Sequence, residues 1–335
     1  MTKQHTSTPA ISTLSIGGAT YDLFLTMSSD AGWKDDAIVL RAGGKLRVGQ
    51  VIETCGGGAC NTAVAFSRLN LSASFCGVIA SDQWGEKLLA TMFGEGVNTD
   101  SATIVEHETS SFSIILSLKT GERTILYTPG VNEHLHDTTF DVDAIKRSTG
   151  VYLNHLCETS CMIEDDIIQA LVTKPDVHLT WNPGGCQIDQ GYDAKDKLAL
   201  LRVTDLLLLN KEEALAFAKT DSVESALRIL TKAGVKHVCI TDGRNGVVAS
   251  DGSKTWHCPV LEGVKVVDTT GAGDAFGAGA SWALLTGRQL PEALRAGTLN
   301  AASVVGAIGA QAGLLTDIQI IQKLQESTLA VSDVH

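Results

Sequence analysis

One carboxylate in this sequence stands beside a turn of small residues that is suited to hold an anion. Asp274 follows Gly271-Ala272-Gly273 and begins an alanine-rich run with helical periodicity. The β-branched residues at 264–267 predict a strand before the turn. A strand, a glycine turn and a helix leave backbone N–H groups that bind an anion, and a carboxylate beside that anion could take a proton from an attacking hydroxyl. A tight turn in which Asp274 caps the helix fits the same pattern.

Two features near the start of the chain suit a polyhydroxylated ligand. Gly56-Gly57-Gly58-Ala59-Cys60-Asn61 precedes an apolar helical run; its glycines allow close approach to the backbone, and Asn61 offers both a donor and an acceptor. Asp22 follows the first predicted strand, at 13–19, and ligands of open parallel sheets lie at such carboxyl ends. A flexible hairpin loop and an ordinary loop aspartate fit these residues equally well.

Polar residues follow two later strands. Asn210 comes directly after a continuous apolar strand, and Glu213 lies three residues on, so both share one face of a helix. An amide and a carboxylate there suit a Mg²⁺ ion held through water, and the same spacing is that of an N-terminal capping box. Thr241, Gly243 and Gly246 follow the next strand, in a turn that suits either a phosphate or a simple hairpin.

The elements that position these residues alternate between strands and helices. From residue 140 the predicted order is strand 151–153, helix 165–172, strand 177–181, strand 206–209, helices 211–218 and 224–233, and strand 237–241. This alternation predicts an α/β fold, a doubly wound, mostly parallel sheet with helices on both faces. Two extended regions, at about 23–55 and 110–128, interrupt it and predict a small projecting β-sheet lid.

Composition limits the class of protein. The 335 residues are 44% hydrophobic and 19% charged, which predicts one large globular domain, at 13–328, between tails at 1–12 and 329–335. The net charge of −12, without a Lys/Arg cluster, disfavours a nucleic-acid partner. The chain lacks an apolar stretch of the roughly 20 residues that a membrane helix needs, and its polar first ten residues lack a signal core, so we expect a cytoplasmic protein without a membrane partner.

Cysteine spacing and nucleotide motifs exclude further classes. The eight cysteines lie among apolar neighbours without a C-x-x-C pair, which favours buried free thiols over a zinc site. The tightest candidate set of zinc ligands is Cys157 and Cys161 beside His155. No G-x-x-x-x-G-K-[ST] phosphate loop is present in the sequence. The glycines at 271–277 follow the pattern G-x-G-x-x-x-G, which differs from the dinucleotide-binding spacing.

Over about residues 13–325 the chain resembles the ribokinase-like (phosphofructokinase-B) carbohydrate kinases. The resemblance rests on Gly56-Gly57-x-x-x-Asn61, similar to the family's N-terminal signature, and on Asp268-Thr269-Thr270-Gly271-Ala272-Gly273-Asp274, similar to its C-terminal signature. Shorter motifs follow in the family's order: Asp82-x-x-Gly85, Gly121-Glu122-Arg123-Thr124, Asn210-x-x-Glu213 and Thr241-x-Gly243-x-x-Gly246.

The resemblance implies an ATP-dependent phosphotransferase, EC 2.7.1-type, that acts on a primary hydroxyl. Asp274 would be the general base, and the turn Gly271, Ala272, Gly273 would be the anion hole, since phosphoryl transfer depends on positioning and charge stabilisation. The other implied contacts are with the sugar (Asp22, Gly57, Gly58, Asn61), with Mg²⁺ and phosphates (Asn210, Glu213), with the nucleotide (Thr241, Gly243, Gly246, Thr298, Asn300) and with a monovalent cation, K⁺ (Asp268, Thr270, Gly309). The extended regions would be the family's β-lid, which closes over the substrate and pairs with a second subunit in a homodimer.

Departures from the family's pattern bear on the ligands. Gly58 stands where ribokinases and kinases of phosphorylated sugars have a lysine, and the missing cation favours a neutral sugar. Thr20 replaces an asparagine of ribokinases, which argues against an identical fit to ribose. Gly313 replaces a ribokinase serine near the monovalent-cation loop, so no side chain there supports K⁺ activation.

We predict a kinase of a neutral ribose- or fructose-like sugar, and a nucleoside (adenosine-like) kinase is the alternative. A nucleoside base needs an apolar or aromatic wall, for which the lid offers Phe24, Phe112 and Tyr127. A non-catalytic sugar- or nucleotide-sensing protein on the same fold is disfavoured because Asp274 and its turn are retained. An oxidoreductase is disfavoured by the missing dinucleotide spacing.

Overall fold

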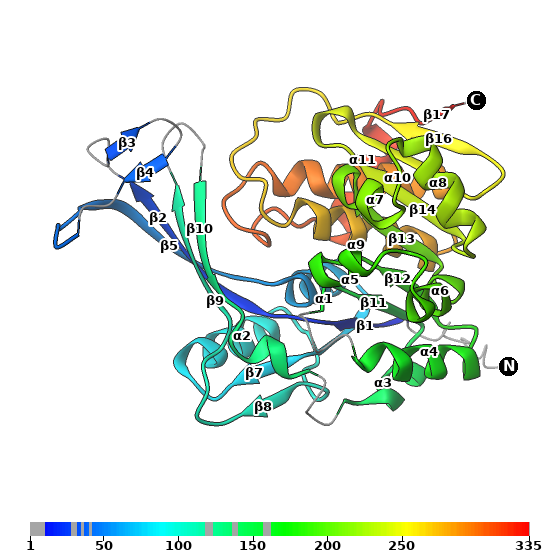
Figure 1. Cartoon of the computed structure of the whole chain (residues 1–335). Helices are drawn as coiled ribbons and strands as arrows, with labels where there is room; N and C mark the ends of the chain where they lie inside the picture. Colours follow the sequence, from blue (N-terminus) through cyan, green and yellow to red (C-terminus); the bar gives the residue numbers. More distant parts are fainter. Residues whose placement is uncertain are drawn as a thin grey trace, which may run out of the picture.

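A nine-stranded sheet forms the centre of the molecule (Figure 1). The computed structural model describes residues 11–27, 32–34, 37–39, 42–117, 123–135, 140–156 and 162–334. The strand order is β17 (Ser332–Asp333), β16 (Thr255–Cys258), β15 (Val247–Ser250), β14 (His237–Thr241), β13 (Leu206–Asn210), β12 (His178–Trp181), β11 (Gly150–Leu153), β1 (Ser12–Ile16) and β6 (Ser72–Cys76). Neighbours from β14 to β6 pair in parallel, and β15 to β17 pair antiparallel at one edge. The predicted doubly wound, mostly parallel sheet is confirmed.

Helices cover both faces of the sheet because its central strands present apolar side chains on both sides. Along β13, Leu206 and Leu208 belong to one hydrophobic cluster, whereas Leu207 and Leu209 belong to the other. The first cluster includes residues of α1 (Gly58–Arg68), α2 (Gln83–Gly94), α9 (Ala272–Leu285), α10 (Leu290–Val304) and α11 (Asp317–Glu326). The second includes residues of α3 (Val142–Arg147), α4 (Glu164–Thr173), α5 (Gly185–Gln190), α6 (Lys195–Arg202), α7 (Lys211–Phe217) and α8 (Val223–Lys232).

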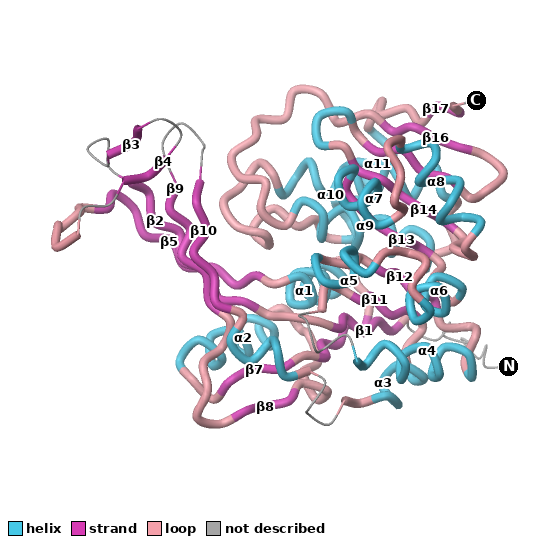
Figure 2. The backbone as a smooth tube through the Cα atoms, viewed as in Figure 1, coloured by secondary structure: helices cyan, strands magenta, loops and turns pink. Residues whose placement is uncertain are grey.

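A second sheet, which we call the lid, projects from this body (Figure 2). Its strands run in the order β10 (Arg123–Thr128), β9 (Phe112–Ser117), β2 (Thr20–Met27) and β5 (Val48–Gly56). Two short pairs complete the strands, β3 (Gly32–Lys34) with β4 (Ala37–Val39) and β7 (Val78–Ala80) with β8 (Thr103–Val105). β9 and β10 pair antiparallel. Residues 118–122, which include Gly121 and Glu122 of the motif noted above, lie outside the described residues.

The strand predicted at 264–267 is wrong, because these residues form a loop that leads into α9. Val266 and Val267 are 61% and 46% exposed, so their β-branched side chains are not packed in a sheet. The backbone N–H groups of Val267 and Asp268 both bond to the carbonyl of Val305, which anchors a loop and does not extend a strand ladder. A loop, not a strand, therefore delivers the chain to the helix.

Other boundaries also differ from the sequence expectation. The first strand ends at Ile16, and Asp22 lies inside β2 of the lid and not in a loop at the strand tip. Residues 72–80 form two short strands, β6 and β7, which belong to different sheets. The predicted C-terminal tail contributes β17, which pairs with β16. Residues 1–10 of the predicted N-terminal tail lie outside the described residues.

The described cysteines are free thiols, namely Cys55, Cys60, Cys76, Cys186, Cys239 and Cys258. Cys157 and Cys161 lie outside the described residues. Within the ranges that the structure describes, no three His, Cys, Asp or Glu side chains gather in a group that could hold a metal ion. Among the helices of those ranges, none has both the length and the apolar character required to cross a membrane.

Candidate active site

The turn before α9 places the N-terminus of this helix beside the carboxylate of Asp274. Gly271 is the N-cap residue with a left-handed backbone (φ 74°), and a Cβ atom there would lie 2.3 Å from the Cβ of Ala310. The cap makes no side-chain hydrogen bond to the first turn, so the N–H groups there, including that of Gly273, are placed to bind an anion. Because Gly271 is the cap, the alternative in which Asp274 caps the helix is wrong.

A hydrogen bond joins Asp274 to Asn61 of the other glycine motif. Nδ2 of Asn61, in the first turn of α1, donates to Oδ2 of Asp274 over 2.8 Å. Asn61 is only 4% exposed, so this bond is largely shielded from solvent. Burial raises the pKa of Asp274 to about 6, while the hydrogen bond from Asn61 acts in the opposite direction. The carboxylate is therefore a base whose pKa lies close to neutral pH.

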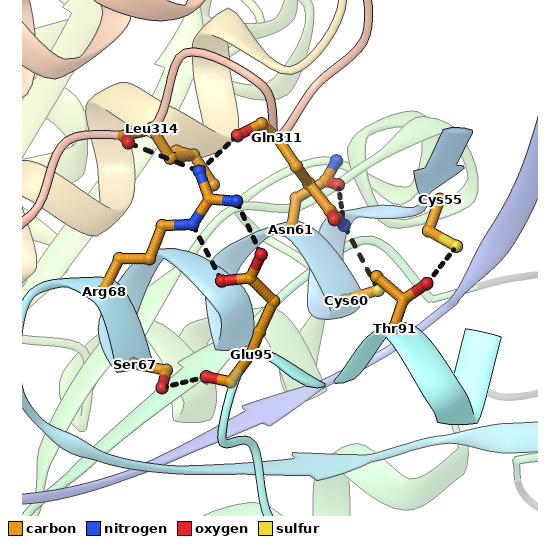
Figure 3. A network of polar contacts seen from close by, with 9 residues as sticks. All are labelled: Cys55, Cys60, Asn61, Ser67, Arg68, Thr91, Glu95, Gln311 and Leu314. Carbon is orange, nitrogen blue, oxygen red and sulfur yellow. Dashed lines mark hydrogen bonds and ion pairs between the residues drawn. The ribbon is translucent and has the colours of Figure 1, made fainter. Parts of the chain in front are cut away.

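Gln311 fixes the orientation of the Asn61 amide (Figure 3). Its Nε2 donates to Oδ1 of Asn61 over 3.1 Å and to Sγ of Cys60 over 3.4 Å, so Nδ2 of Asn61 is the end that faces Asp274. The carbonyl of Gln311 accepts from Nη1 of Arg68 over 2.7 Å, and Arg68 also forms a two-point contact with Glu95, over 2.8 and 2.6 Å. Gln311 could not be found by sequence analysis, because it belongs to none of the motifs identified there.

The glycine turn before α1 borders a cavity of about 290 Å³. Gly57 has a left-handed φ of 86°, and a Cβ there would lie 2.6 Å from the carbonyl oxygen of Gly18, so only glycine allows the two segments to pack. The cavity brings together residues of the glycine pair after β1, the glycine turn before α1, β7, the lid, the segment after β10 and the loop after β11: Gly17, Gly18, Thr20, Gly57, Gly58, Val78, Tyr127, Asn132, Leu135, Asn154, His155 and Leu156. Of the predicted sugar contacts, Gly57 and Gly58 line this cavity, whereas Asp22 and Asn61 are not among its lining residues.

Asp22 is a second buried carboxylate near this turn. It is 7% exposed, and a Cβ added to Gly56 would lie 2.2 Å from its Oδ2. Burial raises the pKa of Asp22 to about 6; a hydrogen bond with Ser113 lowers it, and the nearby charge of Asp268 raises it. Strand pairing places Asp22 between Thr54 of β5 and Ser113 of β9, so the lid holds this side chain from both sides.

Asp268, where the resemblance places a monovalent cation, is surrounded by donors of the protein. The backbone N–H and the hydroxyl of Thr270 donate to its Oδ1 over 3.0 and 2.8 Å, and the N–H of Gly309 donates to its Oδ2 over 3.0 Å. Nη1 of Arg123, at the start of β10, also donates to Oδ1 and forms an ion pair. The residues therefore do not fit a cation at Asp268 while Arg123 is in this position.

The predicted nucleotide residues after β13 and β14 lie next to each other, because Asn210 and Thr241 are register partners at the ends of these strands. Asn210 Oδ1 accepts from the N–H of Glu213 and Glu213 Oε2 accepts from the N–H of Asn210, both over 2.8 Å. The capping box, one of the two alternatives, is thus present. Burial raises the pKa of Glu213. Gly243 and Gly246 follow Thr241 in a short 3₁₀ turn and have φ angles of 47° and 85°.

Asn300, one of the predicted nucleotide contacts, lies in the core. It is fully buried; its Nδ2 donates to the carbonyl of Ala275 over 2.8 Å, and its Oδ1 accepts from the N–H of Leu315 over 3.0 Å. These two bonds tie α10 to the first turn of α9 and to the loop before α11, so the contacts of Asn300 in this structure are structural ones. Thr298 is also buried, with its hydroxyl 3.5 Å from Sγ of Cys258, and offers little surface to a nucleotide.

The arrangement suits transfer of an anionic group to a hydroxyl. A carboxylate whose pKa is raised to about 6 can accept the proton of the hydroxyl at neutral pH, and the adjacent helix N-terminus can stabilise negative charge on the transferred group. Asp274, its turn and Asn61 meet at this point, whereas Asn210 and Thr241 lie at the end of two strands of the main sheet.

Comparisons with known proteins point to the same chemistry. Residues 15–317 match the pfkB family of carbohydrate kinases. An uncharacterized sugar kinase of Archaeoglobus fulgidus is 29% identical over 252 residues, which are 75% of this chain and 98% of that protein. The structure of Arabidopsis thaliana ribokinase complexed with ribose and ATP superposes with a TM-score of 0.78 and 22% identity, over 95% of this chain and 99% of that one. Sinorhizobium meliloti adenosine kinase superposes with a TM-score of 0.78 and 23% identity, over 94% and 99%.

Proposed function

Since the chain belongs to the pfkB family of carbohydrate kinases and is a phosphotransferase that acts on an alcohol group, we propose that it transfers the γ-phosphoryl group of ATP to a primary hydroxyl of a neutral, ribose- or fructose-like sugar. The observation that carries the proposal is the carboxylate of Asp274, which Asn61 holds at the N-terminus of α9, where no side chain caps the first turn. A base and an anion site in contact are the two parts that phosphoryl transfer to an alcohol requires.

Asp274 accepts the proton of the sugar hydroxyl as that oxygen attacks the γ-phosphorus. With a pKa of about 6 the carboxylate is ionised at neutral pH and still basic enough to take the proton. The N–H groups in the first turn of α9, that of Gly273 among them, hold the negative charge of the transferred group. Asn61 keeps the carboxylate aimed at the hydroxyl through its 2.8 Å hydrogen bond.

The ATP side is proposed at the ends of β13 and β14. Thr241, Gly243 and Gly246 would line the nucleotide, and the register pairing of Asn210 with Thr241 places the Mg²⁺ candidates beside them. Glu213 and Asn210 would hold Mg²⁺ through water, and the ion would neutralise phosphate oxygens. The capping box uses Oε2 of Glu213 and Oδ1 of Asn210, and a carboxylate has further lone pairs for a metal-bound water, so the residues fit both roles.

A small neutral sugar fits the acceptor side better than a nucleoside does. The cavity of about 290 Å³ lies at the small end of the range for ligand pockets. Of the aromatic candidates for a nucleoside wall, Phe24 is buried, and Phe112 packs on Trp84 with 5.0 Å between ring centroids. Tyr127 is the candidate that lines the cavity. Gly58 brings no cation to that cavity, and this favours a neutral sugar over a sugar phosphate.

The lid is the proposed dimer contact of a cytoplasmic enzyme. β10 exposes Ile125, Leu126 and Tyr127, at 50%, 50% and 54%, and Val51 of β5 is 53% exposed. Apolar side chains on both edge strands of a small sheet favour coverage by another protein surface. A second copy of the chain is the partner that the family resemblance implies.

The test is an ADP-release assay across neutral pentoses and hexoses, their phosphates, and nucleosides, with wild type and Asp274→Asn. We expect turnover with a neutral sugar and a loss of about a thousandfold or more in kcat for Asp274→Asn, because the base is removed. The sugar dissociation constant should change little. Near wild-type turnover in the variant would remove Asp274 as the base. Preferential turnover of a sugar phosphate or of a nucleoside would overturn the substrate assignment.

A further inference from the structure

We propose that Arg123 of the lid is a built-in replacement for the monovalent cation, so that this enzyme works without K⁺. The guanidinium of Arg123 contacts three consecutive residues of the loop before α9. Nη1 donates to Asp268 and, over 2.9 Å, to the hydroxyl of Thr270, and Nη2 donates to the hydroxyl of Thr269 over 3.1 Å. These bonds join the lid strand β10 to the loop that ends at Gly271.

The Oδ1 atom of Asp268 has no coordination site left for a metal ion. A carboxylate oxygen offers about two lone-pair sites, and three donors of the protein are already directed at this one. They are the N–H and hydroxyl of Thr270 and Nη1 of Arg123, whereas Oδ2 accepts from the N–H of Gly309. A potassium ion at Oδ1 would have to displace one of the three, and Arg123 is the one of them that carries a positive charge, which would repel an ion at either oxygen.

The charge of Asp268 needs a partner at this position. Its side chain is 7% exposed, whereas that of Arg123 is 30% exposed, so the cation reaches a buried anion from the solvent side. Asp22 lies close enough to Asp268 for its pKa to be raised by that charge. Two neighbouring buried carboxylates without a cation would repel each other. The guanidinium supplies the charge that a bound cation would supply otherwise.

The pairing also gives Arg123 a positioning role in the proposed reaction, on which this part of the inference rests. Thr269 and Thr270 directly precede Gly271, whose left-handed backbone sets the direction of the first N–H groups of α9. Arg123 holds both hydroxyls from the lid. A residue of the lid therefore holds the anion site in place when the lid occupies this position. Closure of the lid over the sugar is thus coupled to ordering of the anion site.

The first test is the dependence of activity on K⁺, with tetramethylammonium as the replacing cation at constant ionic strength and constant Mg²⁺. Wild-type kcat should vary by less than about twofold across the K⁺ titration, because ionic strength is unchanged. Arg123→Ala should lose about tenfold to a hundredfold in kcat without K⁺, and K⁺ should restore most of the loss. The control Arg47→Ala removes an exposed arginine of the segment that leads into β5, and should behave as wild type does.

The second test does not depend on activity. Crystals of wild type and of Arg123→Ala are grown with Tl⁺, whose anomalous signal locates the ion. We expect no Tl⁺ at Asp268 in wild type and a Tl⁺ ion there in Arg123→Ala. A Tl⁺ site at Asp268 in wild type, K⁺ activation of wild type, or an Arg123→Ala variant with neither a K⁺ response nor a Tl⁺ site would each overturn the inference. If wild type phosphorylates no acceptor, the proposed function fails, and the crystals still decide the role of Arg123.

Discussion

The hydrogen bond from Asn61 to Asp274 makes a quantitative prediction for the pH dependence of the reaction. Asn61→Ala removes the donor that lies 2.8 Å from Oδ2 and stabilises the ionised carboxylate. A hydrogen bond to a charged group contributes about 1.5–3 kcal/mol, and 1.36 kcal/mol corresponds to one pKa unit. Allowing for water that enters the vacated space, we expect the pKa of Asp274 to increase from about 6 to about 7 or above.

The assay is the pH profile of kcat/KM for the sugar, whose acid limb reports the base in the free enzyme. Activity requires ionised Asp274, so kcat/KM should fall as the pH drops through about 6 in wild type. In Asn61→Ala the same fall should occur at about one pH unit higher, with activity regained at alkaline pH. Gln311→Ala, which frees Oδ1 of Asn61 but keeps the donor, is the matched control and should shift the limb less.

The profile separates two roles of Asn61. If Asn61 acted through sugar contacts alone, Asn61→Ala would lower kcat/KM equally at every pH and leave the acid limb where it is. An unshifted limb in Asn61→Ala would therefore refute the argument that this amide sets the pKa of the base. Protonation of ATP affects wild type and variants alike, because all are measured under the same conditions, and it cancels in the comparison.

Three further predictions follow from the same contacts. Burial raises the folded-state pKa of Asp274 to about 6, so the protonated side chain favours the folded state, and this stabilisation is lost as the pH rises through about 6. Thermal melts should therefore show that Asp274→Asn is more stable than wild type by about 1–3 kcal/mol at pH 8 and equally stable at pH 4. Gly271→Ala should lower Tm, since its Cβ would meet Ala310 at 2.3 Å, whereas Gly273→Ala, with no neighbouring atom within 4 Å, should not. Glu213→Gln keeps an oxygen for the capping box, and we expect it to raise the Mg²⁺ concentration needed for half-maximal rate. An unchanged Mg²⁺ requirement would leave Glu213 with the capping role only.

Much of the fold was predictable because it is encoded in local patterns. The continuous apolar run of β13 packs with alternate leucines on opposite faces, as a strand buried on both sides must. The two glycine motifs could be located because left-handed backbone at Gly57 and Gly271 demands this residue type. The strand at 264–267 failed as a prediction, since β-branched composition favours extended backbone but supplies no neighbouring strand to pair with.

The sequence by itself indicated Asp274 as the candidate base, its glycine turn and the alternation of elements, because each depends on residues that are neighbours in the chain. Only the tertiary structure decided which of these groups act together. Asn61 reaches Asp274 across 213 residues, and Arg123 reaches Asp268 across 145. The tertiary structure also placed Asn300 in the core and Gln311 against the amide of Asn61. Side-chain partners so far apart are set by how the helices and the lid pack on the sheet, and a packing arrangement leaves no periodic pattern in the sequence.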